Sequence, residues 1–128
     1  AEPDLAVAHR EGEAEAGARR IVLGAVPDGA RVLPADSLSG DLGEVVARLG
    51  AEGVVQLLVE GGADVAGRFL RADLVDLAVV YVAPAFAGGD DGVPMFRGSG
   101  AASVDRLWRG RFESVTRLGD DVRLVVVP

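Results

Sequence analysis

The sequence predicts an α/β fold with three layers: a mainly parallel sheet, helices on both of its faces, and an antiparallel hairpin at the C-terminal end. Several short apolar runs are continuous, which is typical of strands buried on both faces of a parallel sheet. Segments with helical periodicity separate these runs. The C-terminal residues instead alternate on either side of Leu118-Gly119-Asp120-Asp121, as expected for a hairpin.

The N-terminal residues predict a strand, a helix and a second strand. Residues 5–8 form a short apolar run, and His9 and Arg10 follow at the end of this expected strand. Residues 11–20 are rich in Glu and Ala, which is compatible with a short exposed helix, and residues 21–23 form the next buried strand. Such a unit predicts a right-handed crossover between parallel strands.

Residues 24–40 are expected to be a connector, because glycines and prolines within them favour turns, with a brief extended piece at residues 32–33. A helix follows, with an apolar stripe made of Leu42, Val45, Val46 and Leu49. Ser39 or Asp41 can cap this helix at its start, and Gly50 or Gly53 can end it.

The stretch that organises the chain begins at Val54. Residues 54–59 form an almost continuous apolar run, which predicts a buried strand that ends at Glu60. Gly61 and Gly62 then form a turn without side chains. In an open α/β sheet, ligands bind beyond the carboxyl ends of strands, and such a turn exposes N–H groups at the positive end of the following helix. The sequence therefore favours a phosphate site here, with tight packing of the turn as the alternative.

The helix after this turn has an apolar face made of Val65, Ala66, Phe69 and Leu70. Asp64 and Arg68, four residues apart, are expected to form a structural pair on its outer face.

Residues 77–83 predict another buried strand, and the glycine-rich residues 87–92 predict a loop. Trp108 either has a packing or subunit-contact role or stacks on a ring. The valine-rich last strand would need a cover if it formed a sheet edge, which favours a homodimer.

Composition excludes several function classes. The 128 residues suit one domain, and the net charge of −7 opposes binding to nucleic acid or to an acidic membrane surface. The chain has no cysteine and one histidine, so a disulfide and a cysteine-based zinc site are excluded, and no metal site is expected. It also has no lysine, which excludes a Schiff-base lysine. Neither a signal peptide nor a membrane-spanning run is seen, so a cytoplasmic protein is expected.

Three segments in order resemble one known family. They are VVQLLVEGGADVAGRFLRADLVD, VVYVAPAFAGGDDGVPMF and VTRLGDDVRL, at residues 54–76, 79–96 and 115–124. Together they look like the C-terminal reductase domain of the riboflavin-biosynthesis deaminase–reductase family. The resemblance implies a dihydrofolate-reductase-like fold, NADPH as cofactor, and reduction of a 5-amino-6-ribosylaminopyrimidine phosphate to its ribitylamino form.

The resemblance also implies roles for individual residues. Gly61 and Gly62, with the N–H groups of Ala63 or Asp64, would hold the cofactor pyrophosphate, and Glu60 would contact the ribosyl part of the substrate. His9 and Arg10, with Arg20 a further candidate, would lie near the 2′-phosphate; the alternative is that they are solvated surface charges. No residue is identified as catalytic, because the cofactor carries the difficult chemistry.

Residues 1–128 are expected to form a single, partial reductase domain. The resembled family begins with a strand and helix that carry an SxDG-type motif, which this sequence does not contain. The chain is therefore expected to be one piece of a longer polypeptide and to be inactive alone. A classical dinucleotide fold is disfavoured because G-x-G-x-x-G is not present. Two alternatives remain: a reductase of the same fold acting on another pteridine or pyrimidine, and a non-catalytic module for nucleotide binding or dimerisation.

Overall fold

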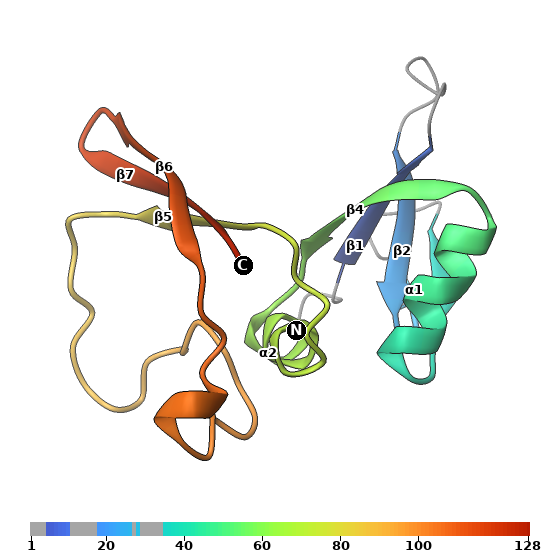
Figure 1. The fold of residues 1–128 in the computed structure, drawn as a ribbon, viewed down its shortest axis with the longest axis horizontal. Coiled ribbons are helices and arrows are strands. Elements are labelled where there is room, and N and C mark those ends of the chain that lie inside the picture. The colour runs from blue at the N-terminus through green and yellow to red at the C-terminus, as the bar shows by residue number, and fades with distance from the viewer. Residues whose placement is uncertain (1–4, 11–17, 27, 29–34) are drawn as a thin grey trace.

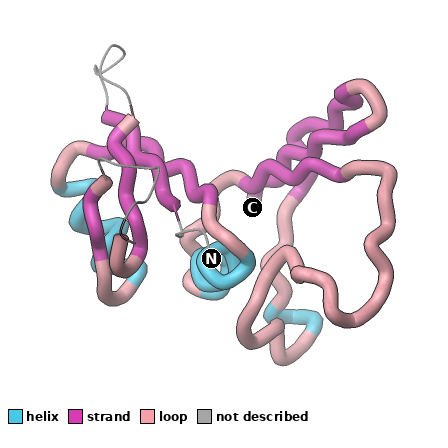
Figure 2. Tube along the Cα trace, turned by 180° about the vertical axis from the view of Figure 1, so that it is seen from behind, coloured by secondary structure: helices cyan, strands magenta, loops and turns pink. Residues whose placement is uncertain are grey.

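The structure is a computed structural model that describes residues 5–10, 18–26, 28 and 35–128. Its elements in chain order are β1 (Leu5–Arg10), β2 (Arg19–Leu23), β3 (Asp36–Leu38), α1 (Leu42–Ala51), β4 (Val54–Glu60), α2 (Ala63–Arg71), β5 (Ala78–Val82), the 3₁₀ turn η1 (Val104–Arg106), β6 (Arg111–Leu118) and β7 (Asp121–Val127). The described strands form two sheets, one with the order β3-β2-β1-β4 and one with the order β5-β7-β6 (Figure 1). Seen from behind, a long loop joins β5 to η1 and β6 (Figure 2). The fold class is α/β, as predicted.

The prediction of a mainly parallel sheet is wrong. Only β2 and β3 pair in parallel, whereas β1 lies between β2 and β4 and pairs with both in the antiparallel sense. The physical reason is the short connection between β1 and β2. A parallel pair needs a crossover of about a dozen residues or more, whereas antiparallel neighbours need only a short link. Arg19 and Arg20, which were assigned to a helix, belong to β2.

Helix α1 forms where its apolar stripe predicted, and Asp41 is the residue that caps it. The Asp41 carboxylate accepts hydrogen bonds from the backbone N–H groups of Gly43 at 2.9 Å and Glu44 at 3.3 Å. These bonds satisfy donors that the first turn of a helix leaves without partners. After α1, Gly53 turns the chain with a φ of +88°, which a glycine adopts without strain, and β4 follows directly.

The core lies between the first sheet and both helices. Ile21, Leu38, Val45 and Leu49 form one buried cluster beneath α1, and Leu42, Val65 and Phe69 form a second cluster beneath α2. Leu23 and Leu57 pack against both clusters, so α1 and α2 cover the same face of the sheet. The predicted arrangement with helices on both faces is not confirmed for the helices that the structure describes. These two helices have ten and nine residues, and neither could cross a bilayer.

The predicted C-terminal hairpin is confirmed. β6 and β7 pair in the antiparallel sense around Gly119, whose φ is +65°. β7 also pairs with β5, so it is the central strand of its sheet. The valine-rich strand is therefore not a sheet edge, so the condition under which it would need a cover is not met. The strand predicted at residues 77–83 is β5.

Two expectations concern residues that the structure does not describe. Most of the helix predicted at residues 11–20 and the extended piece at residues 32–33 lie outside the described residues. The end of the expected connector, however, contains a strand. Residues 36–38 form β3, which pairs with β2 from Ile21 to Leu23.

Candidate functional site

The carboxyl end of β4 is where the sequence placed a ligand. β4 ends at Glu60, which is exposed, and α2 begins at Ala63 with Gly62 as its N-cap. Gly62 is exposed and has φ −69° and ψ −178°, which is ordinary extended backbone. No side chain caps α2 by a hydrogen bond. The positive end of this helix is thus not neutralised by a capping carboxylate, in contrast to α1.

Gly61 has a packing role. A Cβ atom built on Gly61 would lie 2.6 Å from the Cβ of Val65 and 2.7 Å from its Cγ1, which is closer than real side chains approach. Val65 itself is only 1% exposed within the cluster beneath α2. Gly61 therefore allows the first turn of α2 to lie against the strand. Tight packing, one of the two interpretations of the glycine pair, is thus observed at Gly61.

A segment distant in the sequence crosses the first half of α2. The Arg97 N–H donates to the Ala63 carbonyl at 2.8 Å, and the Arg71 guanidinium donates to the Arg97 carbonyl at 2.7 Å. Gly67 leaves the room for this crossing, because a side chain there would collide with the Arg97 carbonyl oxygen. The guanidinium of Arg97 lies 3.9 Å from the Asp64 carboxylate. Asp64 therefore pairs with Arg97, and not with Arg68 as the sequence spacing suggested.

Arg68 lines a shallow pocket at the carboxyl ends of β2 and β3. The pocket has a volume of about 120 Å³ and is lined by Leu23, Gly24, Leu38, Ser39, Gly40, Val45 and Arg68. Because β2 and β4 both run antiparallel to β1, their carboxyl ends lie at the same edge of the sheet. The pocket and the glycine turn therefore share one edge. Ser39 and Arg68 were not predicted as site residues, since Ser39 was considered only as a cap.

His9 and Arg10 lie at the opposite end of the sheet. β1 runs against β4, with Leu5 opposite Glu60, His9 opposite Gln56 and Arg10 opposite Val54. Along a strand, the four steps from Gln56 to Glu60 span about 13 Å. The structure does not bring His9 and Arg10 together with the glycine turn. β1 is antiparallel to β4, so the carboxyl ends of these two strands lie at opposite edges of the sheet.

Arg20, the further candidate, is exposed in β2 opposite Val7. Its row is level with Leu58 of β4, two residues before Glu60, and β1 lies between the two strands.

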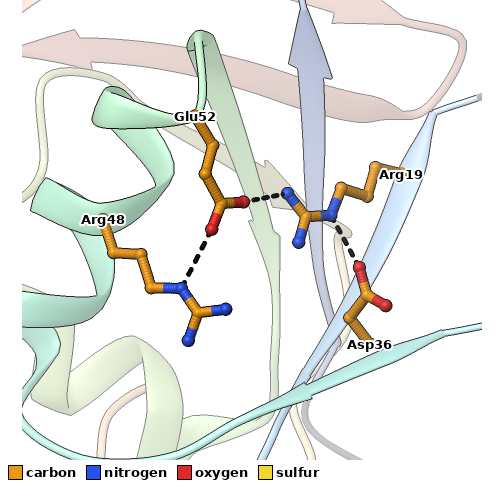
Figure 3. Close-up of polar contacts among 4 residues, drawn as sticks. All are labelled: Arg19, Asp36, Arg48 and Glu52. Atoms are coloured by element: carbon orange, nitrogen blue, oxygen red, sulfur yellow. Dashed lines mark hydrogen bonds and ion pairs between the residues drawn. The ribbon is translucent and has the colours of Figure 1, made fainter.

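The same distant end carries an ion-pair network (Figure 3). Arg19 Nε lies 2.6 Å from Asp36, Arg19 Nη1 lies 2.6 Å from Glu52, and Arg48 Nε lies 2.9 Å from Glu52. Hydrogen bonding from Arg19, and then from Arg48, lowers the pKa of Glu52, and the bond to Glu52 is the main cause that raises the pKa of Arg19. The network joins β2, β3 and the end of α1, which is a structural role.

Comparisons with known proteins agree with this fold. The family model described as RibD C-terminal domain matches residues 2–124. The riboflavin biosynthesis protein RibD of Bacillus amyloliquefaciens is 33% identical over 85 residues, which cover 66% of this chain and 23% of that protein. RibD of Mycobacterium tuberculosis strain H37Rv is 37% identical over 71 residues, covering 56% of this chain and 20% of that protein.

A solved structure is also similar. Acinetobacter baumannii RibD, form 2, matches with a TM-score of 0.67 and 25% identity over 84% of this chain and 30% of that chain. The chain thus spans less than a third of the length of the relatives it matches. Since the family model covers nearly all of residues 1–128, the chain belongs to the RibD C-terminal domain family.

Proposed function

We propose that this chain is part of an NADPH-dependent reductase that acts in riboflavin biosynthesis. Its substrate would be a 5-amino-6-ribosylaminopyrimidine phosphate, and its product the ribitylamino compound. Membership of the RibD C-terminal domain family supports this class, and the names of the curated relatives support the pathway. When bound, NADPH would supply the hydride that reduces C1′ of the ribosyl group. The protein would then supply binding, orientation and the placement of charge.

The observation that carries the proposal is the start of α2. Its N-cap is a glycine, no side chain caps it by a hydrogen bond, and it begins directly after the carboxyl end of β4. The backbone N–H groups of Ala63 and Asp64 therefore lie in the first turn, at the positive end of a helix, which favours the oxygens of a pyrophosphate. Gly61 contributes indirectly, by letting this turn approach the strand. At α1, in contrast, the N-cap Asp41 already accepts from the N–H groups of Gly43 and Glu44, whose equivalents in α2 are Asp64 and Val65.

The charges around this turn are compatible with a bound phosphate. The guanidinium of Arg97 lies near the turn, and Arg68 lies on the same helix at the neighbouring pocket. The Asp64 carboxylate opposes an anion, and its ion pair with Arg97 reduces that effect. A pocket of about 120 Å³ is smaller than the ~300–1,000 Å³ usual for a ligand site, so it would hold only part of a dinucleotide.

Glu60 would contact the ribosyl part of the substrate. Its carboxylate is exposed at the last position of β4, directly before the glycine turn. A carboxylate accepts hydrogen bonds from sugar hydroxyls, and its place beside the proposed pyrophosphate site would put those hydroxyls near the reacting end of the cofactor.

A charge reversal at the turn tests the proposal. Gly62→Glu should weaken NADPH binding by at least about tenfold, because its carboxylate would stand where the phosphate oxygens are placed. The φ of −69° suits any L-residue, so the fold should remain. Gly100→Glu is the matched control, since it adds the same charge at a loop position with nothing within 4 Å of the new Cβ.

Binding would be followed by NADPH fluorescence and folding by circular dichroism. Equal affinity of the Gly62→Glu variant and the wild type would contradict the assigned site. Binding of NADPH without turnover of the pyrimidine ribosylamine phosphate would instead favour the alternative of a nucleotide-binding module.

A further inference from the structure

We propose that Arg97 is a further cofactor-binding residue, and that its guanidinium binds the pyrophosphate of NADPH at the start of α2. The inference rests on the proposed function, from which it takes the cofactor and the place where the pyrophosphate binds. It adds a residue from the long loop between β5 and η1, which the spacing of residues in the sequence did not identify.

The main chain of Arg97 is fixed on α2 by both of its hydrogen-bonding groups. The Arg97 N–H donates to the Ala63 carbonyl at 2.8 Å, and the Arg97 carbonyl accepts from the guanidinium of Arg71 at 2.7 Å. Gly67 lies beneath this crossing, where a side chain would collide with the Arg97 carbonyl oxygen. Ala63, Gly67 and Arg71 are spaced four residues apart, so they form one stripe along the helix. The loop is thus held along this stripe.

The side chain of Arg97 reaches the neighbouring stripe of α2. This stripe carries Asp64 and Arg68, which are also four residues apart, and Arg68 lines the pocket at the carboxyl ends of β2 and β3. The Arg97 guanidinium lies 3.9 Å from the carboxylate of Asp64, a residue of the first turn. Arg97 and Arg68 therefore bring two positive charges to the stripe that leads from the first turn toward the pocket.

The contact with Asp64 leaves the Arg97 guanidinium available for a ligand. Its length of 3.9 Å exceeds the roughly 2.7–3.2 Å of an N–H···O hydrogen bond. The side chains of Arg97 and Asp64 are 53% and 70% exposed, and ion pairs in contact with solvent are weak and screened by salt. Arg19, in contrast, lies 2.6 Å from each of its two carboxylate partners. A phosphate that accepts two parallel N–H bonds from a guanidinium forms a stronger contact than the present one.

A pyrophosphate at this turn needs a compensating positive charge. The carboxylate of Asp64 lies in the same turn, and the net charge of −7 gives the whole chain a field that opposes anions. A guanidinium has five N–H donors, so Arg97 can bind phosphate oxygens and remain beside Asp64. Because its main chain is already fixed on α2, little conformational entropy is lost when its side chain binds.

Arg97→Ala tests the inference, because it removes the guanidinium and keeps both main-chain groups of position 97. The affinity of the 128-residue protein for NADPH should fall about tenfold or more, whereas Arg97→Lys, which keeps the charge, should lose less. Arg117→Ala is the matched control. The Arg117 guanidinium also lies 3.9 Å from an aspartate, Asp120, but on the hairpin of the second sheet. NADPH fluorescence measures binding, and circular dichroism verifies folding.

Two further comparisons separate a direct contact from other roles. If Arg97 acted only by neutralising Asp64, its removal would have no effect in an Asp64→Asn background. A direct contact predicts that Arg97→Ala weakens NADPH binding about tenfold in that background as well. Since NADH and NADPH share the pyrophosphate, Arg97→Ala should weaken the binding of both by the same factor.

Each of these measurements can overturn the inference. Wild-type affinity of Arg97→Ala, with affinity lost in Gly62→Glu, would overturn it and leave the proposed function in place. So would an effect of Arg97→Ala that disappears in the Asp64→Asn background. A loss for NADPH alone would also overturn it, because the contact would then be with the 2′-phosphate. Absence of NADPH binding by the wild type would overturn this inference and the proposed cofactor site together.

Discussion

Replacing Gly61 by alanine should destabilise the fold, whereas the same change at Gly62 should not. The new Cβ at position 61 would lie 2.6 Å from the Cβ of Val65, so α2 must move away from β4. Overpacking of this kind costs about 1–3 kcal/mol, and the loss of glycine entropy in the unfolded chain offsets about 0.4–1 kcal/mol of it. The net loss should be about 1–2 kcal/mol, which lowers Tm by about 4–8 °C in a chain of this size.

Thermal unfolding followed by circular dichroism measures this difference. Gly62→Ala should stay within about 0.5 kcal/mol of the wild type, because its backbone is extended with φ −69°. Gly100→Ala is a further control with nothing within 4 Å of the added Cβ. The double variant Gly61→Ala, Val65→Ala should lose somewhat less stability than the sum of the two single losses, because the contact with Cγ1 at 2.7 Å is removed while the contact with Cβ at 2.6 Å remains. A Gly61→Ala protein as stable as the wild type would refute the packing role of this glycine.

Two predictions concern the ion-pair network and the start of α1. Because the pKa of Glu52 is lowered in the folded state, its contribution to stability is present above the ordinary glutamate pKa of about 4.3 and is lost as the pH falls through the folded value. Glu52→Gln should therefore be less stable than the wild type in urea at pH 7, with a smaller difference at pH 3; an equal difference at both pH values would contradict the network. Asp41→Ala should lose about 1 kcal/mol through its missing cap, while Asp41→Ser, which can still accept the N–H bonds, should recover most of it. Equal urea midpoints for the two Asp41 variants would show that the carboxylate does not act as a cap.

The elements predicted correctly are those specified by adjacent residues. Asp41 and the apolar stripe define α1, the apolar run followed by two glycines defines β4 and α2, and the alternation around Gly119 defines the hairpin. Each of these elements depends on residues that are close to one another in the sequence, such as helix caps, periodic apolar residues and turn residues. A single sequence carries these signals directly.

The direction of the strands could not be read in the same way. An apolar run indicates burial but does not identify the neighbouring strand, so β1 was expected to be parallel to β2 when it is antiparallel. That difference moved His9 and Arg10 away from the glycine turn. The three-residue strand β3 was missed because it is too short to show a period.

The site was predicted only where it is local. Glu60 to Asp64 follow one another at the end of β4, so the sequence places them together. Arg97 reaches the same turn from a distant loop, and Arg68 turns toward the pocket instead of Asp64. Contacts between distant segments depend on the packed fold, which periodicity and spacing do not report.

The crossing of Arg97 over α2 restricts how this protein can vary among its relatives. Gly67 has no side chain that would collide with the Arg97 carbonyl. The guanidinium of Arg71 fills the space beside Gly98, whose φ is +101°. A larger residue at position 67 would displace the loop, and a shorter one at position 71 would release it. Substitutions at positions 67, 71 and 98 should therefore occur together in evolution, so that helix and loop are inherited as one unit.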